Sequence, residues 1–396
     1  MPPGLTGFNG SRLREAREAR LLTGVSLAEL AHATSAMISQ YEHGKRTPQS
    51  DVLQRIADAL RLPVSFFLQG HEDESVLDSP LTFRSFSSAT KGARTREDWR
   101  FRWHVTITHY LERFVALPQV RFPDWDVPAP NDLSDQDIDL VATKLRRFWG
   151  LDDEPISDLV ELAERNGAVV VRYDLGAQAL DAYSAWSADR PHIILGADKM
   201  AAVRSRYDAV HEIAHLVLHR QISDVQLKTG ELHKEIERQA NFFAGSFLLP
   251  AGTFAEDFTV PTLDAVLSLK PKWRVSVGAM IFRAEWLSLI PEDQARRLWI
   301  SYGRRGWRNH EPFDEELPIE QPRTLRAAFD LARQARSFTI GGLRSAHHYS
   351  DADIEQLLGL PHDYLRDVPH GDMHTWRQDS GEGGDSGFRL LEFPTR

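Results

Sequence analysis

The stretch HEIAHLVLH, from His211 to His219, constrains this chain more than any other short segment. Histidine forms helices poorly, so three histidines in an otherwise apolar helical segment need a functional reason. On a helix, His211 and His215 lie on one face, one turn apart, where both imidazoles reach the same ion. Glu212 lies about 100° further round the helix, next to a water that such an ion would activate. The pattern therefore predicts two metal ligands, His211 and His215, and a general base, Glu212, in a hydrolytic enzyme.

The motif alone leaves the site incomplete, because a catalytic zinc takes a third protein ligand. The chain has no cysteine, which leaves histidine, aspartate and glutamate as candidates. In the downstream segment KEIERQANFFAG, Glu237 lies beside an apolar helical stripe that would face a neighbouring helix. We therefore predict Glu237 as the third ligand. Two alternatives stay open: His233 takes this place, or Glu237 is one of several solvated helix acids.

Two further polar residues are expected around this site. Asn241 follows Glu237 by four residues on the same helical face. Its amide oxygen is expected to accept the outward N–H of a ligating histidine. His219 is rotated by about 80° from His211 on an ideal helix. Three imidazoles at these angles do not converge well on one ion, so His219 is expected beside the ligands and not among them.

The whole-chain composition limits the class of protein. At 396 residues the chain is too long for one ordinary core, so two or three domains are expected. A formal net charge of −10 argues against a protein that coats nucleic acid with its whole surface. No apolar run is long enough for a membrane span, and the first residues lack the apolar stretch of a signal peptide. These features predict a cytoplasmic protein with no membrane partner.

Periodicity and turn signals predict a multidomain, mainly α protein with one α+β part. The parts are a helical module at 1–70, a hinge and helical linker at 71–125, a mixed α/β segment at 126–260, a helical extension at 261–310, a helical region at 311–365 and a disordered tail at 366–396. In the mixed segment, AVVVRYDL and RPHIILG read as strands.

Two other segments give more local expectations. In the linker, arginines alternate with Trp99, Phe101 and Trp103. This favours a helix with buried aromatics and solvated arginines over a nucleic-acid-binding surface. In the helical extension, two helices are expected around a turn at Lys270-Pro271, because proline disfavours a helix interior.

The residues around the histidine motif also carry a family resemblance. With RYDAV before HEIAH, and ERQAN and FFAGSFLLP after it, roughly residues 130–310 resemble the ImmA/IrrE family of zinc-dependent metallopeptidases. The resemblance implies a thermolysin-like fold with Zn²⁺ bound by three side chains and one glutamate as the base. Those residues are His211, His215 and Glu237 for the metal, and Glu212 for the base.

The resemblance also implies how a substrate is held. A peptide would lie extended along an edge strand, for which the candidate is the segment of Ile193, Ile194 and Leu195. Family members typically cleave a repressor or an antitoxin, so the implied substrate is a partner protein. Spacing does not identify the group that stabilises the oxyanion. The candidates are Tyr183, Tyr207 and Tyr302.

A second resemblance covers the N-terminal module. SLAELAHATSAMISQYEHGKRTPQSDVLQRIADALRLPVSFFL is similar to a Cro/CI-type (XRE) helix-turn-helix, a module often fused ahead of this peptidase. In such modules the second helix of the motif enters the major groove and basic residues hold phosphates. By this resemblance the DNA-binding residues are Ser39 and Gln40, facing the bases, with Lys45 and Arg46 near the backbone.

One departure from that resemblance affects the DNA-binding interpretation. Leu30-Ala31 is followed by Ile38-Ser39 after only HATSAM, about three residues fewer than is usual, and no glycine marks the turn. We therefore expect a shortened or re-aimed recognition helix. Weak DNA binding, formation of a homodimer, docking of a protein and a purely structural helical bundle all stay open.

The sequence thus favours a zinc-dependent endopeptidase fused to a DNA-binding-type domain, which regulates by cleaving a partner such as a repressor or antitoxin. The alternative is a DNA-binding transcriptional regulator, or an antitoxin, whose zinc fold senses or binds a partner without cleaving it. Hydrolysis of a small molecule is a third possibility. An intact set of His211, Glu212, His215 and Glu237 favours the enzyme, because a pure sensor does not need the base.

Overall fold

The computed structural model describes residues 7–70, 90–176, 181–198, 201–222, 230–335, 338–366 and 391–392. The chain divides into two compact units. The first unit is discontinuous and comprises 1–78, 89–117 and 323–396; the second comprises 79–88 and 118–322. In the described part of the chain, no helix is long and apolar enough to cross a membrane.

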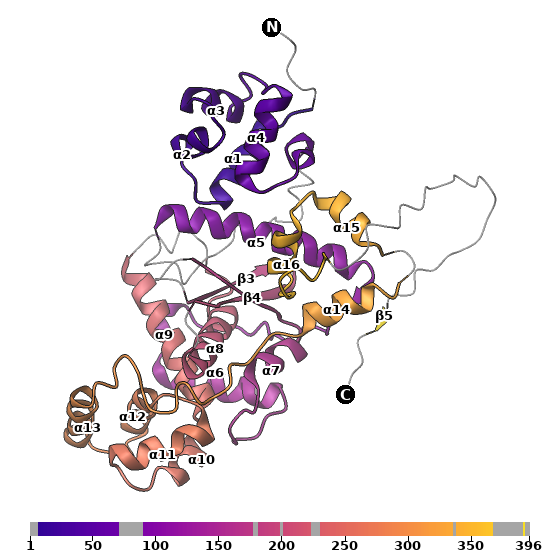
Figure 1. Ribbon diagram of the computed structural model, residues 1–396. Helices are drawn as coiled ribbons and strands as arrows, with labels where there is room; N and C mark the ends of the chain where they lie inside the picture. Colours follow the sequence, from indigo (N-terminus) through magenta and orange to yellow (C-terminus); the bar gives the residue numbers. More distant parts are fainter. Residues whose placement is uncertain are drawn as a thin grey trace. The chain divides into compact units, whose positions relative to one another are not determined.

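The first unit is helical (Figure 1). Its elements are α1 (Gly10–Ala19), α2 (Gly24–Leu30), α3 (Ser35–Glu42), α4 (Ser50–Leu60), the 3₁₀ helix η1 (Val64–Leu68), α5 (Lys91–Glu112), α14 (Thr324–Ala332), α15 (Ile340–His347) and α16 (Asp351–Leu357). A short parallel pair joins β1 (Val115–Ala116) to β5 (Leu391–Glu392).

The predicted linker helix, α5, is the centre of this unit. The Trp103 ring stacks on Tyr349 with ring centroids 4.9 Å apart, and its indole N–H donates to Glu15 at 2.6 Å. Arg20, the residue that follows α1, forms a two-pronged ion pair with Asp353 of α16. Residues from both ends of the chain therefore share one core with α5. The sequence-based division into separate N-terminal, linker and C-terminal parts did not anticipate this arrangement.

Two arginines of α5 differ from expectation, whereas Arg94 is exposed as expected. Arg96 and Arg100 are buried, and both donate to the carboxylate of the fully buried Glu97. A buried carboxylate needs charged or hydrogen-bonding partners to offset its lost hydration. Arg96 and Arg100 supply these partners and are therefore part of the core. The sequence pattern predicted that they would be solvated, and for these two residues that prediction is wrong.

The predicted hinge and the predicted C-terminal tail lie largely outside the residues that the structure describes. The hinge at 71–89 lies outside the described residues, as do 367–390 and 393–396 of the predicted disordered tail. Leu391 and Glu392 of that tail pair with Val115 and Ala116 as a strand.

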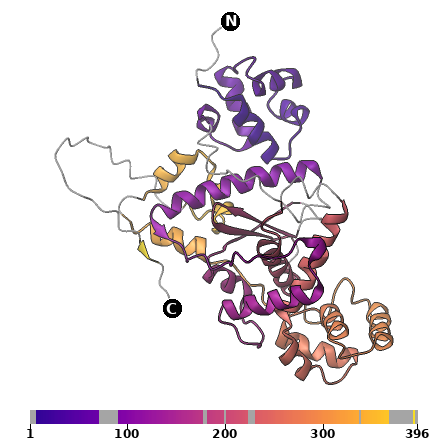
Figure 2. The ribbon, with the colours of Figure 1, turned by 180° about the vertical axis from the view of Figure 1, so that it is seen from behind.

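The second unit combines a small sheet with helices (Figure 2). Its elements are η3 (Pro130–Asp132), α6 (Asp135–Phe148), α7 (Leu159–Arg165), β2 (Val169–Tyr173), β3 (Ala182–Ser187), β4 (Arg190–Gly196), α8 (Ala202–Leu218), α9 (Gly230–Leu248), α10 (Ala251–Asp257), α11 (Leu263–Trp273), α12 (Val277–Trp286) and α13 (Glu292–Arg304). The strands AVVVRYDL and RPHIILG are confirmed as β2 and β4.

The sheet topology corrects the predicted substrate strand. The strand order is β2-β4-β3, with β4 parallel to β2 and antiparallel to β3. Ile193, Ile194 and Leu195 lie on β4, are fully buried and have neighbouring strands on both sides. Their main-chain hydrogen-bonding groups are already used within the sheet, so they do not form an edge strand. The continuous apolar run of this segment is what a central, doubly covered strand requires.

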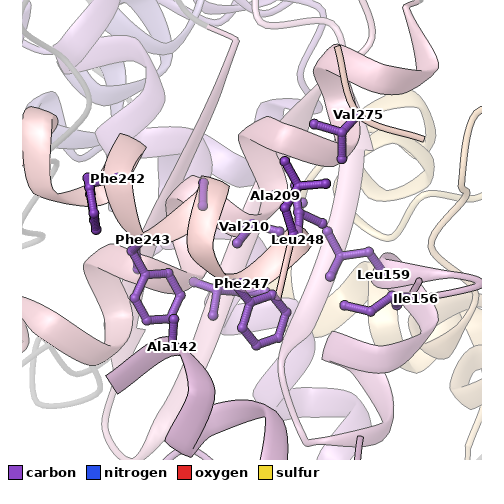
Figure 3. Close-up of a cluster of buried hydrophobic side chains, with 14 of the residues drawn as sticks. Ala142, Ile156, Leu159, Ala209, Val210, Phe242, Phe243, Phe247, Leu248 and Val275 are labelled. Atoms are coloured by element: carbon purple, nitrogen blue, oxygen red, sulfur yellow. The ribbon is translucent and has the colours of Figure 1, made fainter. Parts of the chain in front are cut away.

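Helices α8 and α9 pack against each other, and α8 also contacts β3 and β4. Figure 3 shows the apolar cluster beneath them, in which Phe243 and Phe247 of α9 lie near Ala142 of α6. The two phenylalanine rings stack with centroids 5.8 Å apart. Small residues on the facing helices, such as Ala209 and Ala240, are completely or almost completely buried. They allow a close approach of the backbones, which sets the distance between side chains on α8 and α9.

The predicted turn at Lys270-Pro271 is wrong, because α11 continues through Pro271 to Trp273. The chain leaves the helix at Arg274, which has a left-handed conformation. Lys270 and Trp273 are both buried. The ammonium group of Lys270 donates to Glu311 at 2.7 Å and to Asp314 at 2.6 Å. These tertiary contacts outweigh the local cost of a proline near the end of the helix.

We predict that Lys270→Ala lowers the free energy of unfolding of the second unit by about 3–5 kcal/mol, because two acids then lose their buried cation. Urea unfolding followed by tryptophan fluorescence measures this change. The matched control is Lys272→Ala on the same helix, whose partner Asp257 forms a more exposed pair and whose loss costs about 0–1 kcal/mol. Equal effects of the two substitutions would contradict the structural role of Lys270.

Candidate functional site

Helices α8 and α9 bring the three predicted metal ligands together. His211 and His215 lie on successive turns of α8, with ring centroids 4.7 Å apart. Glu237 lies on α9 and faces them. One nitrogen or oxygen atom from each of the three residues lies within 4.8 Å of the others. His233, the rival third ligand, lies one turn before Glu237 and is not part of this group.

The distances between these atoms suit a divalent metal ion. His211 Nε2 lies 3.0 Å from His215 Nε2 and 3.2 Å from Glu237 Oε2, and His215 Nε2 lies 3.4 Å from Glu237 Oε1. Tetrahedral zinc with ligands about 2.0–2.1 Å away would separate them by roughly 3.3 Å. Glu237 Oε1 is buried and accepts no hydrogen bond from the described residues. That property fits an oxygen whose partner is a cation.

The electrostatics of the cluster favour ligand-competent protonation states. Burial alone would raise the pKa of Glu237, but the close contacts with His211 and His215 and their charges hold this pKa well below its usual range. Burial lowers the pKa of His215. Burial also opposes protonation of His211, but its hydrogen bond to Glu237 and the charge of Glu212 raise its pKa overall. A metal ion would therefore displace a proton from His211 on binding.

Glu212 lies beside the ligands and is held in place from the sheet. Its side chain is almost fully buried. The hydroxyl group of Ser184, on β3, donates to Glu212 Oε2 at 2.7 Å. This bond fixes the rotamer of the carboxylate and leaves the other oxygen, Oε1, outside it. Sequence reasoning missed Ser184, because the strand AYSAWS has no clear alternation and was not predicted.

A chain of hydrogen bonds determines which nitrogen of His215 carries its proton. The amide nitrogen of Gln239 donates to the carbonyl of Pro130 at 2.6 Å and to Glu235 at 2.9 Å. Its amide oxygen therefore faces His219 Nε2, 3.1 Å away, and accepts a hydrogen bond from the N–H group there. A neutral His219 then accepts at Nδ1 from His215 Nδ1, which lies 3.0 Å away. This leaves the lone pair of His215 Nε2 for the metal cluster.

His219 thus contacts a predicted ligand without belonging to the cluster. Gln239 is a second residue, after Ser184, that sequence reasoning missed. The structure corrects the expectation for Asn241. Its side chain is exposed, and its amide group donates to the main-chain carbonyl of Glu237 at 2.8 Å. Asn241 therefore forms a hydrogen bond within α9. The hydrogen bond to a ligating histidine that was expected of Asn241 is made by His219, which Gln239 contacts in turn.

The three tyrosines proposed for oxyanion stabilisation all use their hydroxyl groups elsewhere. Tyr183 is buried and bonds to the hydroxyl of Tyr173 at 2.9 Å. Tyr207 lies one turn before His211 and donates to the main-chain carbonyl of Asn241 at 2.7 Å. Tyr302 donates to Glu311 at 2.9 Å. Of the three, Tyr207 is the one adjacent to the ligands along α8.

The first unit contains a complete helix-turn-helix. Helices α2 and α3 are joined by the turn Ala31–Thr34, in which His32 has a positive φ of 49°. Thr34 caps α3 by accepting from the main-chain N–H of Met37. Gly10 of α1 packs so close to the main-chain carbonyl of Tyr41 that a Cβ atom there would overlap it. The arrangement of α1 against α3 therefore depends on that glycine.

This geometry corrects the prediction of a shortened recognition helix. Leu30 ends α2 and Ala31 opens the turn, so this pair was the wrong reference point. The buried pair within α2 is Leu27-Ala28. The segment between Leu27-Ala28 and Ile38-Ser39 is three residues longer than the segment between Leu30-Ala31 and Ile38-Ser39. Its length is therefore the usual one for this motif. His32 adopts the left-handed conformation for which glycine is the usual residue.

The predicted DNA-facing residues differ in exposure. Ser39 on α3 is exposed, as are Lys45 and Arg46 in the loop that follows. Gln40 is half-buried, and its amide oxygen is buried without a hydrogen-bond partner among the described residues. The main-chain carbonyl of Gln40 accepts from the N–H groups of Lys45 and Arg46, which orders the basic loop against α3.

Comparison with protein families agrees with both parts of this description. Residues 163–285 match the family model described as the IrrE N-terminal-like domain, a peptidase family. Residues 13–67 match a helix-turn-helix family model. None of the curated proteins compared with the chain matches it. These matches confirm the two resemblances over the matched residues: one segment is similar to a metallopeptidase-like domain, and the N-terminal segment is similar to a helix-turn-helix of the XRE type.

We predict that the purified protein binds about one divalent metal ion per chain and that Glu237→Ala weakens this binding by about 10-fold or more, because an anionic ligand is lost. Metal content by mass spectrometry and competition with a chelator measure the effect. Glu231→Ala, at an exposed position on the same helix, is the matched control and keeps the metal. Unchanged affinity in Glu237→Ala would remove Glu237 from the ligand set.

Proposed function

We propose that the chain is a zinc-dependent endopeptidase that regulates transcription by cleaving a partner protein. One observation carries this proposal: the buried carboxylate of Glu212, held by Ser184, lies next to the cluster of His211, His215 and Glu237. Two neutral nitrogens, one anionic ligand and an adjacent base are the parts that metal-assisted peptide hydrolysis requires.

Zinc is the metal that best suits this donor set. Two imidazoles and one carboxylate form a three-ligand site of the kind used by catalytic zinc, with a further coordination position left for reactants. When bound there, zinc would supply Lewis-acid polarisation of the scissile carbonyl and of the attacking water. His211, His215 and Glu237 would hold the ion, and the bonds through His219 and Gln239 would keep His215 in the right tautomer.

Glu212 is the proton carrier in this proposal. Its carboxylate takes the proton of the attacking water and later delivers it to the leaving amine, a role that requires it to be anionic first and protonated afterwards. Ser184 donates to one oxygen of this carboxylate at 2.7 Å, which orients the group for proton transfer. Burial excludes competing solvent and strengthens each electrostatic interaction within the site.

The substrate is proposed to bind as an extended segment along β3. In the described part of the chain β3 pairs only with β4, and it carries Ser184 next to the general base. A peptide could add to its open edge by main-chain hydrogen bonds. An extended segment of this kind comes from an accessible region of a polypeptide. The family resemblance points to a repressor or an antitoxin as that partner.

The helix-turn-helix would bring this peptidase to DNA or to a DNA-bound partner. Its exposed residues Ser39, Lys45 and Arg46 lie on and directly after α3, the helix that enters the major groove in such domains. The alternative function is a regulator whose zinc fold binds a partner without cutting it. That alternative gives no reason for holding the Glu212 carboxylate beside the ligands, so we favour the peptidase. A homodimer stays a prediction.

We predict that Glu212→Gln retains the metal but lowers peptide cleavage by about 10²–10⁴-fold, because the amide cannot accept the proton. Cleavage of a proteome-derived peptide library, read by mass spectrometry, together with metal content, measures both properties. Glu231→Gln is the control for a surface change of the same kind. If wild type and Glu212→Gln both bind zinc but neither cuts any peptide, the non-cleaving alternative gains support. Normal cleavage by Glu212→Gln would exclude it as the base.

We predict that Lys45→Ala combined with Arg46→Ala weakens DNA binding and reduces the slope of log affinity against log salt by roughly 2, because about 0.9 is lost for each phosphate contact on B-form DNA. Fluorescence anisotropy with duplex DNA at several salt concentrations measures the slope. The matched control replaces Lys91 and Arg94 of α5 with alanine. An equal slope for wild type and the Lys45/Arg46 variant would exclude this surface from phosphate contact.

A further inference from the structure

The second unit contains a cavity of about 550 Å³ that the proposed chemistry does not use. It is lined by residues of α8, α12 and α13 and of the segment after α13, and none of the three metal-ligand residues belongs to its lining. We call it the aromatic–acidic cavity. Its wall on α8 includes Tyr207 and Asp208, which precede His211 by one helical turn.

Aromatic rings form one side of the cavity. Trp299 and Tyr302 of α13 make an edge-to-face contact with centroids 5.5 Å apart, and Trp307 contacts Tyr302 in the same way at 6.2 Å. Phe282 of α12 also lines the cavity, although half of its surface is exposed. Exposed large aromatic side chains next to a cavity are a common feature of ligand sites. Their negative faces attract cations as well as apolar groups.

Two acidic residues of the cavity already have cationic partners. Glu311 and Asp314 share the buried ammonium group of Lys270, and Glu311 also accepts from the main-chain N–H groups at the start of α12. They are therefore part of the structural core of this unit. Because Lys270 already neutralises Glu311 and Asp314, these two acids attract a cationic ligand less strongly than an unpaired carboxylate does.

Asp208 differs from them. No hydrogen bond or ion pair to its carboxylate is found among the residues that the structure describes, and its side chain is half-buried in the wall of the cavity. Burial, together with the nearby charge of Asp181, raises the pKa of Asp208 to about 7. Arg204, Arg308 and His310 also line the cavity, but all three are exposed, so solvent screens their charges. Among the described residues that line the cavity, no buried cation pairs with Asp208.

The position of Asp208 relates the cavity to the proposed reaction. Asp208 and Glu212 are four residues apart on α8, about 6 Å along the helix axis, and their charges influence each other. A group bound at Asp208 would lie within the reach of one side chain from a peptide bond placed beside Glu212. The cavity is therefore at the right distance to receive a side chain close to the scissile bond.

We propose that the aromatic–acidic cavity is a specificity pocket that binds a cationic side chain, lysine or arginine, of the polypeptide substrate. This inference rests on the proposed peptidase function. The aliphatic stem would lie against Trp299 and Trp307, and the ammonium or guanidinium group would pair with Asp208. Such a cation supplies the partner that this half-buried carboxylate lacks. An uncharged side chain of equal length would cover the half-buried carboxylate without pairing with it, which is the basis of the preference.

The first test measures binding without catalysis. Nα-acetyl-arginine amide and its uncharged counterpart Nα-acetyl-norleucine amide are titrated into the full chain by calorimetry, with tryptophan fluorescence as a second readout. We expect the arginine probe to bind at least about 10-fold more tightly, and Asp208→Asn to remove most of this difference. Asp293→Asn, at an exposed position on α13, is the matched control and keeps the difference. Equal binding of both probes by wild type would overturn the proposal.

The second test reads the preference in cleavage. Wild type and Asp208→Asn are given the proteome-derived peptide library, and the residues on either side of each cut are counted. We expect lysine and arginine to be enriched at one fixed position near the cut by wild type, and this enrichment to fall several-fold in Asp208→Asn. The zinc content of each protein is measured in parallel, so loss of metal is recognised as a separate effect.

The two tests separate failure of this inference from failure of the proposed function. Cleavage without any preference for a basic residue leaves the peptidase standing and overturns the specificity pocket. Absence of cleavage by zinc-loaded wild type overturns the peptidase. If the arginine probe still binds through Asp208 in that case, the cavity takes a free cationic molecule, and its assignment to a substrate side chain is wrong.

Discussion

The contact between α8 and α9 is the constraint on which the site depends. Neither helix contains a metal site by itself, since α8 supplies two nitrogens and α9 one carboxylate. Their separation is set by buried small residues on both helices and by the stacked phenylalanines of α9 beneath them. Because apolar cores are close-packed and resist small displacements, the 3.2 and 3.4 Å distances from Glu237 to His211 and His215 follow from the core.

A buried ion pair between Arg206 and Glu320 holds α8 against its other neighbours. Arg206 of α8 pairs with Glu320 and donates to the carbonyl of Ile156, while Glu320 accepts from the main-chain N–H groups of Leu159 and Val160 at the start of α7. One acidic residue thus ties α8, the first turn of α7 and the segment after α13 together. Because desolvation offsets much of the attraction within a buried ion pair, the net contribution of this pair to stability is small.

The sequence allowed the metal cluster to be predicted, because helical spacing places His211 and His215 on one face whatever the rest of the fold. Glu237 required one further assumption, that its helix packs on the first. Ser184 could not be found in this way, since it lies on a strand whose small and aromatic residues show no alternation and whose partner is distant in sequence. The edge-strand prediction failed for a related reason: an apolar strand reveals that it is buried, but not which neighbours it has.

The helix-turn-helix shows a different limit. Two Leu-Ala pairs are available as reference points in SLAELAHA, and the family pattern was counted from the second. The structure distinguishes them, because Leu27 and Ala28 are buried in α2 whereas Leu30 is exposed at its end. A glycine usually marks the turn of this motif, but here His32 adopts the left-handed conformation. The turn therefore cannot be located from the position of a glycine. A residue keeps a strained backbone conformation only where the surrounding contacts stabilise it. A single sequence does not show which contacts surround a residue, so it does not predict such a conformation.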